Sequence, residues 1–140
     1  MKTEVMNEPI LRSSKFSLHN RAKSFVYAGR GILYFFRTQH NSWLQLCAAF
    51  LALLLALFLK IQVSEWSWII FSIGFVFSAE MMNTAIEYLA DVASPGHNEK
   101  VGRLKDLAAG AVLLSSLTAL VIGILIFTPK IILLLGSIRS

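Results

Sequence analysis

The fold of this protein is decided by the stretch Trp66–Asp91, which reads WSWIIFSIGFVFSAEMMNTAIEYLAD. Its first half is uncharged and rich in aromatic and branched side chains, as expected of a helix that crosses a membrane. Its second half carries three acids and an amide, namely Glu80, Asn83, Glu87 and Asp91. Ionisable side chains are costly at membrane depth unless they face a partner or a cavity. The stretch therefore predicts a membrane helix that carries a functional site.

The four polar residues fall on one face of that helix. Each helical residue advances by about 100°, so positions 80, 83, 87 and 91 lie within roughly 80° of arc. At about 1.5 Å per residue, a helix that begins at Trp66 places Glu80 about 21 Å along its axis. We predict a polar stripe in which Glu80 lies within the bilayer, whereas Glu87 and Asp91 lie near the membrane surface.

Three interpretations of this polar stripe remain open. Clustered carboxylates can bind Mg²⁺, which prefers oxygen ligands and often bridges to nucleotide phosphates. A carboxylate at membrane depth can act as a general base. The structural alternative is a clamp between helices, in which the acids pair with Lys or Arg of the next segment.

Two further apolar segments complete a three-helix membrane domain. The segment at 42–59 contains eighteen uncharged residues, about the minimum that crosses ~30 Å of hydrocarbon. The third segment contains twenty-one uncharged residues, Leu107–Phe127. We predict an all-α membrane protein with transmembrane helices at about 42–59, 66–90 and 106–128. The short apolar patch Ile131–Leu135 either extends the third helix or lies at the membrane interface.

Basic residues set the expected orientation. The 140-residue chain has a formal net charge of +5, and 56% of its residues are hydrophobic. The basic residues flank the apolar runs, which is typical of a membrane protein and argues against a nucleic-acid partner. Ten of the thirteen Lys and Arg residues lie before the first span or between the second and third. This excess predicts a cytoplasmic N-terminus. The single Cys47 excludes an intrachain disulfide.

The N-terminal region has its own pattern. We predict a flexible tail at residues 1–15 and a single membrane domain at residues 16–140. Within that domain, residues 16–37 mix aromatic side chains with Arg and Lys, and the apolar positions recur at near-helical spacing. This pattern is typical of an amphipathic helix that lies on an anionic membrane surface.

The third apolar segment opens with GRLKDLAAGAVLL, Gly102–Leu114. Arg103 and Lys105 suit phosphate oxygens, and Asp106 suits the positive end of a helix dipole. The small residues around Ala109 allow a neighbouring helix or a lipid head group to approach the backbone. If the second and third helices pack antiparallel, these groups lie level with the surface end of the polar stripe. The combined residues indicate phosphoryl transfer to a substrate that resides in the bilayer.

The motif ExxNTAIExxxD at Glu80–Asp91, followed by Lys105 and Asp106, resembles the small prokaryotic integral-membrane diacylglycerol kinase family. That family includes the undecaprenol kinases of Gram-positive bacteria. The resemblance covers roughly Ser24 to Phe127. It implies a homotrimer in the bacterial inner membrane, with active sites between subunits at the cytoplasmic face. It further implies ATP as phosphoryl donor, Mg²⁺ as cofactor and a lipid alcohol, diacylglycerol or undecaprenol, as acceptor.

The resemblance also implies roles for single residues. Glu80 would be the general base that takes the proton from the lipid hydroxyl, and Asn83 would support it by hydrogen bonding. Glu87 would hold the metal that bridges the ATP phosphates, and Ala109 would line the lipid site beside Glu80. The implied nucleotide-contacting residues are Arg21, Tyr27, Glu87, Asp91, His97, Asn98, Lys105 and Asp106.

Two departures from the family pattern qualify this hypothesis. Many members have Glu where Gln39 stands, and that Glu is a second metal ligand; Gln39 offers a carbonyl oxygen without charge. Relatives often read SPEYH where this chain reads SPGHN at 94–98, which alters the nucleotide contacts of His97 and Asn98. The alternative function is a noncatalytic membrane interaction or packing subunit derived from the kinase fold, for which Gln39 is the suggestive feature.

Overall fold

The computed structural model of the protein describes residues 18–96 and 98–139, and these residues form four helices with no strand among them. The helices are α1 (Leu18–Thr38), α2 (His40–Phe58), α3 (Val63–Ala93) and α4 (Glu99–Arg139). Three of them, α2, α3 and α4, are long and apolar enough to cross a membrane. The all-α prediction and its three apolar helices are therefore confirmed. The predicted tail at residues 1–15 lies outside the described residues.

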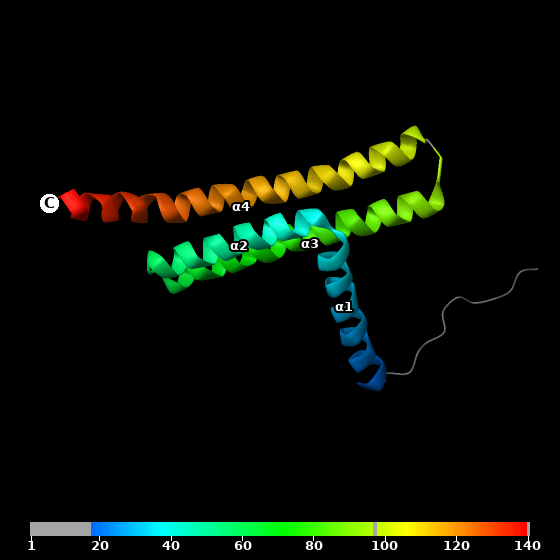
Figure 1. The fold of residues 1–140 in the computed structure, drawn as a ribbon, viewed down its shortest axis with the longest axis horizontal. Coiled ribbons are helices and arrows are strands. Elements are labelled where there is room, and N and C mark those ends of the chain that lie inside the picture. Colours follow the sequence, from blue (N-terminus) through cyan, green and yellow to red (C-terminus); the bar gives the residue numbers. More distant parts are fainter. Residues whose placement is uncertain (1–17, 97, 140) are drawn as a thin grey trace, which may run out of the picture.

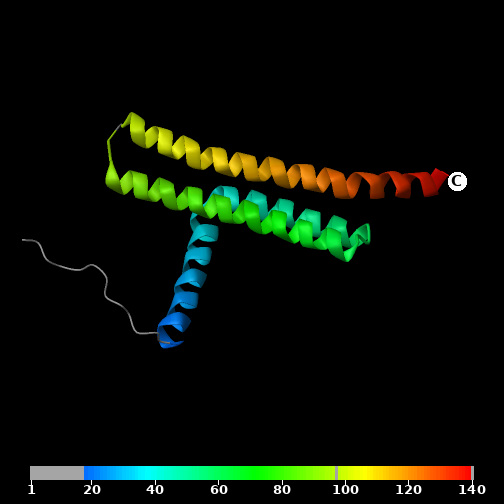
Figure 2. The same ribbon diagram turned by 180° about the vertical axis from the view of Figure 1, so that it is seen from behind.

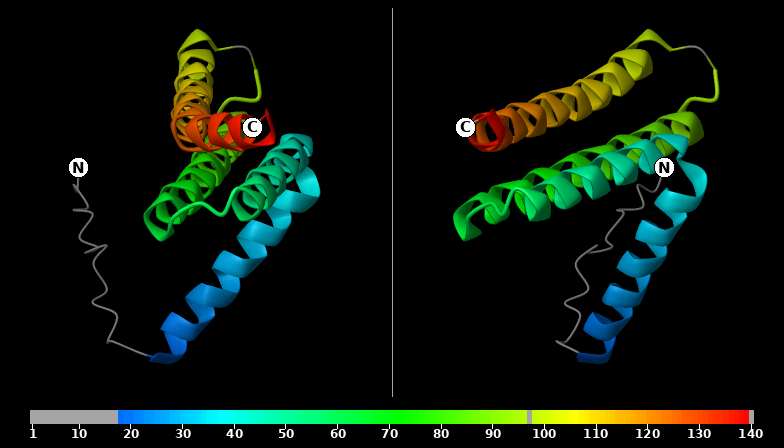
Figure 3. Two further views of the ribbon diagram at one scale, coloured as in Figure 1. Left: turned by 90° about the vertical axis from the view of Figure 1, so that its left-hand side faces the viewer. Right: turned by 60° about the vertical axis from the view of Figure 1, so that its left-hand side comes forward.

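The three apolar helices lie side by side, and α1 projects away from them. Figures 1 and 2 show α3 and α4 running antiparallel, with α2 alongside the first part of α3. Figure 3 shows that α1 leaves the others at a steep angle from the start of α2. The junction of α1 and α2 forms a corner. The C-terminal part of α3 and the N-terminal part of α4 extend past this α1–α2 corner (Figure 1). The corner therefore lies beside the middle of α3, where the polar stripe begins.

The buried apolar core lies at the other end of the bundle. Its centre is formed by four residues from α2, α3, α4 and the loop that joins the first two: Ala56, Ile61, Ile69 and Ile126. Partly buried side chains such as Trp66 and Phe127 pack around it. Most other large apolar side chains point outward and are exposed. Such a surface suits contact with lipid or with further protein rather than with water.

Polar contacts fix both ends of the α3–α4 pair. At one end, Lys105 Nζ lies 2.5 Å from Asp91 Oδ1. At the other end, Lys130 Nζ lies 3.1 Å from Glu65 Oε2, and the same carboxylate accepts a hydrogen bond from the backbone N–H of Gln62 at 2.6 Å. This second contact belongs to a capping box that starts α3. The predicted antiparallel packing and the levels of Asp91 and Lys105 are thus confirmed.

Several predicted boundaries were wrong. The predicted spans at about 66–90 and 106–128 leave a polar loop between them, but among the described residues of that stretch only 94–96 and 98 are non-helical. The side-chain oxygen of Asn98 accepts the backbone N–H groups of Lys100 and Val101, at 3.0 and 3.4 Å, and so starts α4 early. At its other end α4 continues through Pro129 to Arg139. The patch at 131–135 therefore extends the third helix.

Candidate active site

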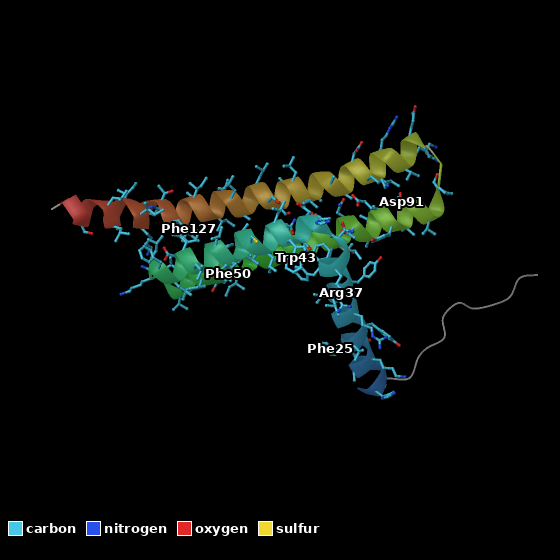
Figure 4. The ribbon with its side chains drawn as sticks, in the orientation of Figure 1. Phe25, Arg37, Trp43, Phe50, Asp91 and Phe127 are labelled. Atoms are coloured by element: carbon cyan, nitrogen blue, oxygen red, sulfur yellow. The ribbon has the colours of Figure 1, made fainter. Side chains whose placement is uncertain are left out.

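The polar stripe of α3 runs from a buried to an exposed environment. Glu80 is only 7% exposed, and Thr84, one turn further on, is also buried. Asn83 and Glu87 are half-buried. The side chain of Asp91 is 65% exposed and lies at the far end of α3, opposite the start of α4 (Figure 4). One helix face therefore presents acids in two different settings.

Glu80 is paired with α2 through a neutral amide. Asn41 Nδ2 donates a hydrogen bond to Glu80 Oε1 at 2.6 Å. Asn41 is the second residue of α2, so Glu80 lies level with the beginning of that membrane-spanning helix. Sequence reasoning missed Asn41. Its position could have indicated it. Asn41 is an amide at the start of the first apolar span, at the same depth as Glu80, the first acid of the second span.

The resemblance implied that Asn83 supports Glu80 by hydrogen bonding, but in this structure its amide donates to Glu87. Asn83 Nδ2 donates to Glu87 Oε1 at 3.0 Å, because residues four apart on a helix lie one above the other. The Oδ1 atom of Asn83 is buried and has no hydrogen-bond partner. In this structure the amide of Asn83 therefore bonds to Glu87, and its supporting role beside Glu80 stays a prediction.

The α1–α2 corner brings Gln39 close to this part of α3. Tyr34 of α1 donates a hydrogen bond to the hydroxyl of Tyr88 at 3.3 Å, and the two rings lie 5.9 Å apart. This bond holds the proton of Tyr34 and raises its pKa. The side chains of Thr38 and Gln39 also approach the Tyr88 hydroxyl. Gln39 therefore lies next to the segment that carries Glu87.

Of the three charged residues predicted for the site at the start of α4, Arg103, Lys105 and Asp106, only Lys105 reaches the polar stripe. Lys105 pairs with Asp91 across the helices. Arg103 instead approaches Glu99 of its own helix, at 3.8 Å. Arg103 and Asp106 line a shallow groove on the surface of α4 together with Leu107, Gly110, Ala111 and Leu114. On a helical projection this surface faces away from the side that packs on α3. Ala109 is likewise exposed.

The remaining predicted nucleotide contacts are dispersed. Tyr27 and Arg21 lie on the projecting helix α1, and Tyr27 precedes Gln39 by twelve residues, or about 18 Å of helix. Tyr27 is 62% exposed, and the Cζ atom of Arg30 lies over its ring, 5.9 Å from the ring centroid. Asn98 uses its side-chain oxygen to cap α4. His97 lies outside the described residues.

A largely apolar cleft of about 510 Å³ adjoins the buried end of the polar stripe. It is formed by α2, α3 and α4, and its wall includes Val76 and Phe77, which lie one turn from Glu80. From there it extends towards Phe127 of α4, labelled in Figure 4. Gln45 also lines the cleft, and its Oε1 atom is buried without a hydrogen-bond partner. The cleft has the composition of a site for a hydrocarbon chain.

The stripe has oxygen donors of the kind that bind Mg²⁺. Within the described part of the chain, no group of three or more His, Cys, Asp and Glu residues is placed to hold a metal ion. Magnesium, however, is commonly held by one or two carboxylates together with substrate phosphates. The carboxylate of Glu87 and the unpartnered Oδ1 of Asn83 lie one turn apart. These donors fit an ion that is shared with a nucleotide.

Known proteins are similar to this chain over most of its length. The family described as "Prokaryotic diacylglycerol kinase" matches residues 26–127. A protein named undecaprenol kinase from Bacillus subtilis is 40% identical over 109 residues, which cover 78% of this chain and 89% of that protein. A protein named diacylglycerol kinase from Synechocystis sp. is 27% identical over 125 residues, covering 89% and 71% of the two chains. The matched residues include the polar stripe and the start of α4.

Proposed function

The chain belongs to the prokaryotic diacylglycerol kinase family and is a lipid kinase; from this premise we propose that it transfers the γ-phosphate of ATP to the hydroxyl of a membrane lipid alcohol. One observation supports this function above the others: the buried carboxylate of Glu80 lies between a hydrocarbon-lined cleft and a surface lined by acids and Lys105. A lipid alcohol and a nucleotide can approach Glu80 from opposite directions.

Glu80 is the general base of the proposed reaction. Its carboxylate takes the proton of the lipid hydroxyl as the hydroxyl oxygen attacks the γ-phosphorus of ATP. The new bond joins this oxygen to phosphorus, the bond between the γ-phosphorus and the β–γ bridging oxygen breaks, and ADP leaves. Because Glu80 is only 7% exposed, bulk water has little access to it. Restricted access favours transfer to the lipid over hydrolysis of ATP.

Glu87 and Asn83 are the proposed metal ligands, with the carbonyl oxygen of Gln39 as a further neutral donor. Bound Mg²⁺ supplies positive charge that neutralises the phosphate oxygens of ATP. Because Gln39 carries no charge where many relatives have Glu, we expect this chain to bind the metal weakly. The Asn83–Glu87 hydrogen bond orients the carboxylate that remains.

The nucleotide site is completed by charged residues and, we propose, by a second subunit. Lys105 can exchange part of its contact with Asp91 for a phosphate oxygen. Asp106 lines the groove on the outer surface of α4, on the side turned away from α3. In the proposed homotrimer, Asp106 lies next to the stripe of a neighbouring copy. Arg21 and Tyr27 of α1, together with His97 and Asn98 in the loop, are proposed to contact the nucleotide from the membrane surface.

We propose undecaprenol as the preferred acceptor and diacylglycerol as the poorer one. The relative named undecaprenol kinase shares 40% identity with this chain, against 27% for the relative named diacylglycerol kinase. The cleft can receive hydrocarbon of either type. The proposed location is the bacterial inner membrane, with the N-terminus in the cytoplasm and α1 lying amphipathically on the surface. Its support is the distribution of Lys and Arg and the steep angle of α1 (Figure 3).

A lipid phosphorylation assay tests the proposed function. The purified protein is incubated in mixed micelles with labelled ATP, a series of Mg²⁺ concentrations and either undecaprenol or diacylglycerol. We expect label to appear in the lipid phase, and faster with undecaprenol. Absence of transfer to either lipid at every Mg²⁺ concentration would contradict the proposed activity. Faster transfer to diacylglycerol would contradict only the choice of acceptor.

A further inference from the structure

The hydrogen bond between Asn41 and Glu80 joins the beginning of α2 to the buried end of the polar stripe. Glu80 is buried, with only 7% of its surface exposed. A buried carboxylate is unfavourable unless polar groups bond to it. Among the described residues, Asn41 is the only side chain that donates a hydrogen bond to Glu80. The neighbouring amide, Asn83, is committed to Glu87.

The position of Asn41 is fixed by the corner between α1 and α2. The backbone N–H of Gln39 donates to Phe35 O at 3.0 Å. The hydroxyl of Ser42, which is fully buried, donates to Gln39 O at 2.6 Å, and its backbone N–H donates to the same oxygen at 3.2 Å. Asn41 is held between these bonded residues. Its amide is therefore presented to α3 from a well-defined turn.

We propose that Asn41 is a positioning residue for phosphoryl transfer. This inference rests on the proposed function, in which Glu80 is the general base. The amide of Asn41 holds Oε1 of Glu80, so the other carboxylate oxygen is turned towards the lipid hydroxyl. Asn41 itself touches neither substrate. Gln39, the proposed metal donor, lies two residues earlier in the same corner. The corner therefore positions both the partner of the general base and a ligand of the metal site.

Loss of this hydrogen bond should slow the transfer without weakening substrate binding. A catalytic group misplaced by about 1 Å typically costs on the order of 100-fold in rate. We therefore expect Asn41→Leu, which has a similar volume but no donor, to lower kcat by about 10- to 100-fold. The KM for ATP should stay within about twofold, because the nucleotide is held by other residues. Asn41→Gln keeps the amide, and since Asn41 is exposed the longer side chain has room. It should recover much of the lost kcat.

The experiment compares these two variants with wild type and with Thr118→Val in the mixed-micelle assay. Thr118 is a matched control, because its exposed hydroxyl bonds only to Leu114 O of its own helix, at 2.8 Å. For each protein, kcat, the KM for ATP, the KM for undecaprenol and the thermal midpoint in micelles are measured. Thr118→Val should resemble wild type in all four.

Three results would overturn the inference: a folded Asn41→Leu with wild-type kcat, a change confined to the KM values, or an Asn41→Gln as slow as Asn41→Leu. Should Asn41→Leu fail to fold, Asn41→Asp decides instead, because it keeps the side-chain shape and replaces the donor with a second carboxylate. A wild-type kcat for Asn41→Asp at pH 8 would reject the positioning role. Failure of the wild-type protein to phosphorylate any lipid would instead reject the proposed function.

Discussion

At the scale of single residues, Glu80 and Asp91 show that one helix face holds acids in different environments. Glu80 is buried and bonded to a neutral amide, at 2.6 Å. Asp91, eleven residues further along the same face, is exposed and paired with Lys105. A neutral partner leaves the charge of Glu80 uncompensated, which suits a group that must accept a proton. A cationic partner balances Asp91, which suits a place beside phosphates.

The role of Glu80 leads to the first prediction. Glu80→Gln keeps the size of the side chain and can still receive a hydrogen bond from Asn41, but it cannot accept the lipid proton. We expect lipid phosphorylation to fall by at least about 100-fold, in line with the loss of a general base. Binding of a non-hydrolysable ATP analogue, measured by calorimetry, should change by less than about threefold. Retained transfer activity would reject the general-base role.

The second prediction concerns Gln39 and the metal. Gln39→Glu restores a carboxylate next to the segment that carries Glu87. Mg²⁺ binds more tightly as charged oxygen ligands are added, so the Mg²⁺ concentration for half-maximal activity should fall by about tenfold. Gln39→Met is the matched control. It removes the side-chain carbonyl oxygen and should raise the Mg²⁺ concentration for half-maximal activity. An unchanged Mg²⁺ requirement in both variants would place Gln39 outside the metal site.

Residue spacing alone predicted the stripe but not its partners. The offsets between Glu80 and Asp91 are a property of one helix and can be read without knowing its neighbours. The Asn41–Glu80 contact joins residues 39 positions apart and depends on how far α2 is shifted along α3. Spacing also could not say which acid Asn83 bonds, because residues three and four positions away on a helix, Glu80 and Glu87, are both its neighbours.

At the scale of helices, hydropathy predicted the three membrane helices better than it predicted their ends. The segment 99–105 is polar and was expected to be a loop, yet it forms the first turns of α4, because Asn98 caps it. The patch at 131–135 was expected either to extend the third helix or to lie at the membrane interface, and α4 passes through Pro129 and includes it. Neighbouring structure can satisfy the backbone group that a proline leaves free in a membrane helix. Hydropathy averaged over a window of residues does not detect a helix cap such as Asn98 or the contacts that allow a helix to continue through Pro129.

The third prediction tests the contact between the start of α3 and the later part of α4. The side chains of Lys130 and Glu65 are 22% and 24% exposed and lie 3.1 Å apart. Lys130→Met and Glu65→Gln should each lower the thermal midpoint in micelles slightly, by an amount equivalent to about 1 kcal/mol or less. The double variant should lose little more than either single one, since both remove the same ion pair.

Glu65→Ala is the informative comparison for that contact. It removes the ion pair and also the acceptor for the backbone N–H of Gln62, whereas Gln at position 65 can keep this capping bond. Glu65→Ala should therefore be less stable than Glu65→Gln by about 1 kcal/mol. Equal midpoints for the two variants would show that the capping box contributes nothing. Strictly additive losses in the Lys130→Met, Glu65→Gln double variant would show that the ion pair contributes nothing.

At the scale of the whole molecule, the residues predicted for the site fall into two sets within a single chain. Glu80, Asn83 and Glu87 face inward on α3, whereas Arg103 and Asp106 line the outer groove of α4. Sequence reasoning predicted both sets and placed the start of α4 level with the surface end of the polar stripe. It could not show that they point in different directions, because this depends on the rotation of α4 about its own axis. Assembly into the proposed homotrimer would bring the two sets together.

Subunit mixing gives the last prediction. Glu80→Gln and Asp106→Asn should each be inactive when expressed alone. If every site uses Glu80 of one copy and Asp106 of another, random mixing of the two variants restores both natural residues in about a quarter of the sites of a cyclic oligomer. Lipid phosphorylation by the co-expressed variants should therefore recover to about a quarter of the wild-type value. The control pairs Glu80→Gln with Glu87→Gln, whose positions share one face of α3, and it should give no recovery. Recovery in the control pair, or none in the test pair, would show that the site is not divided between α3 of one chain and α4 of its neighbour.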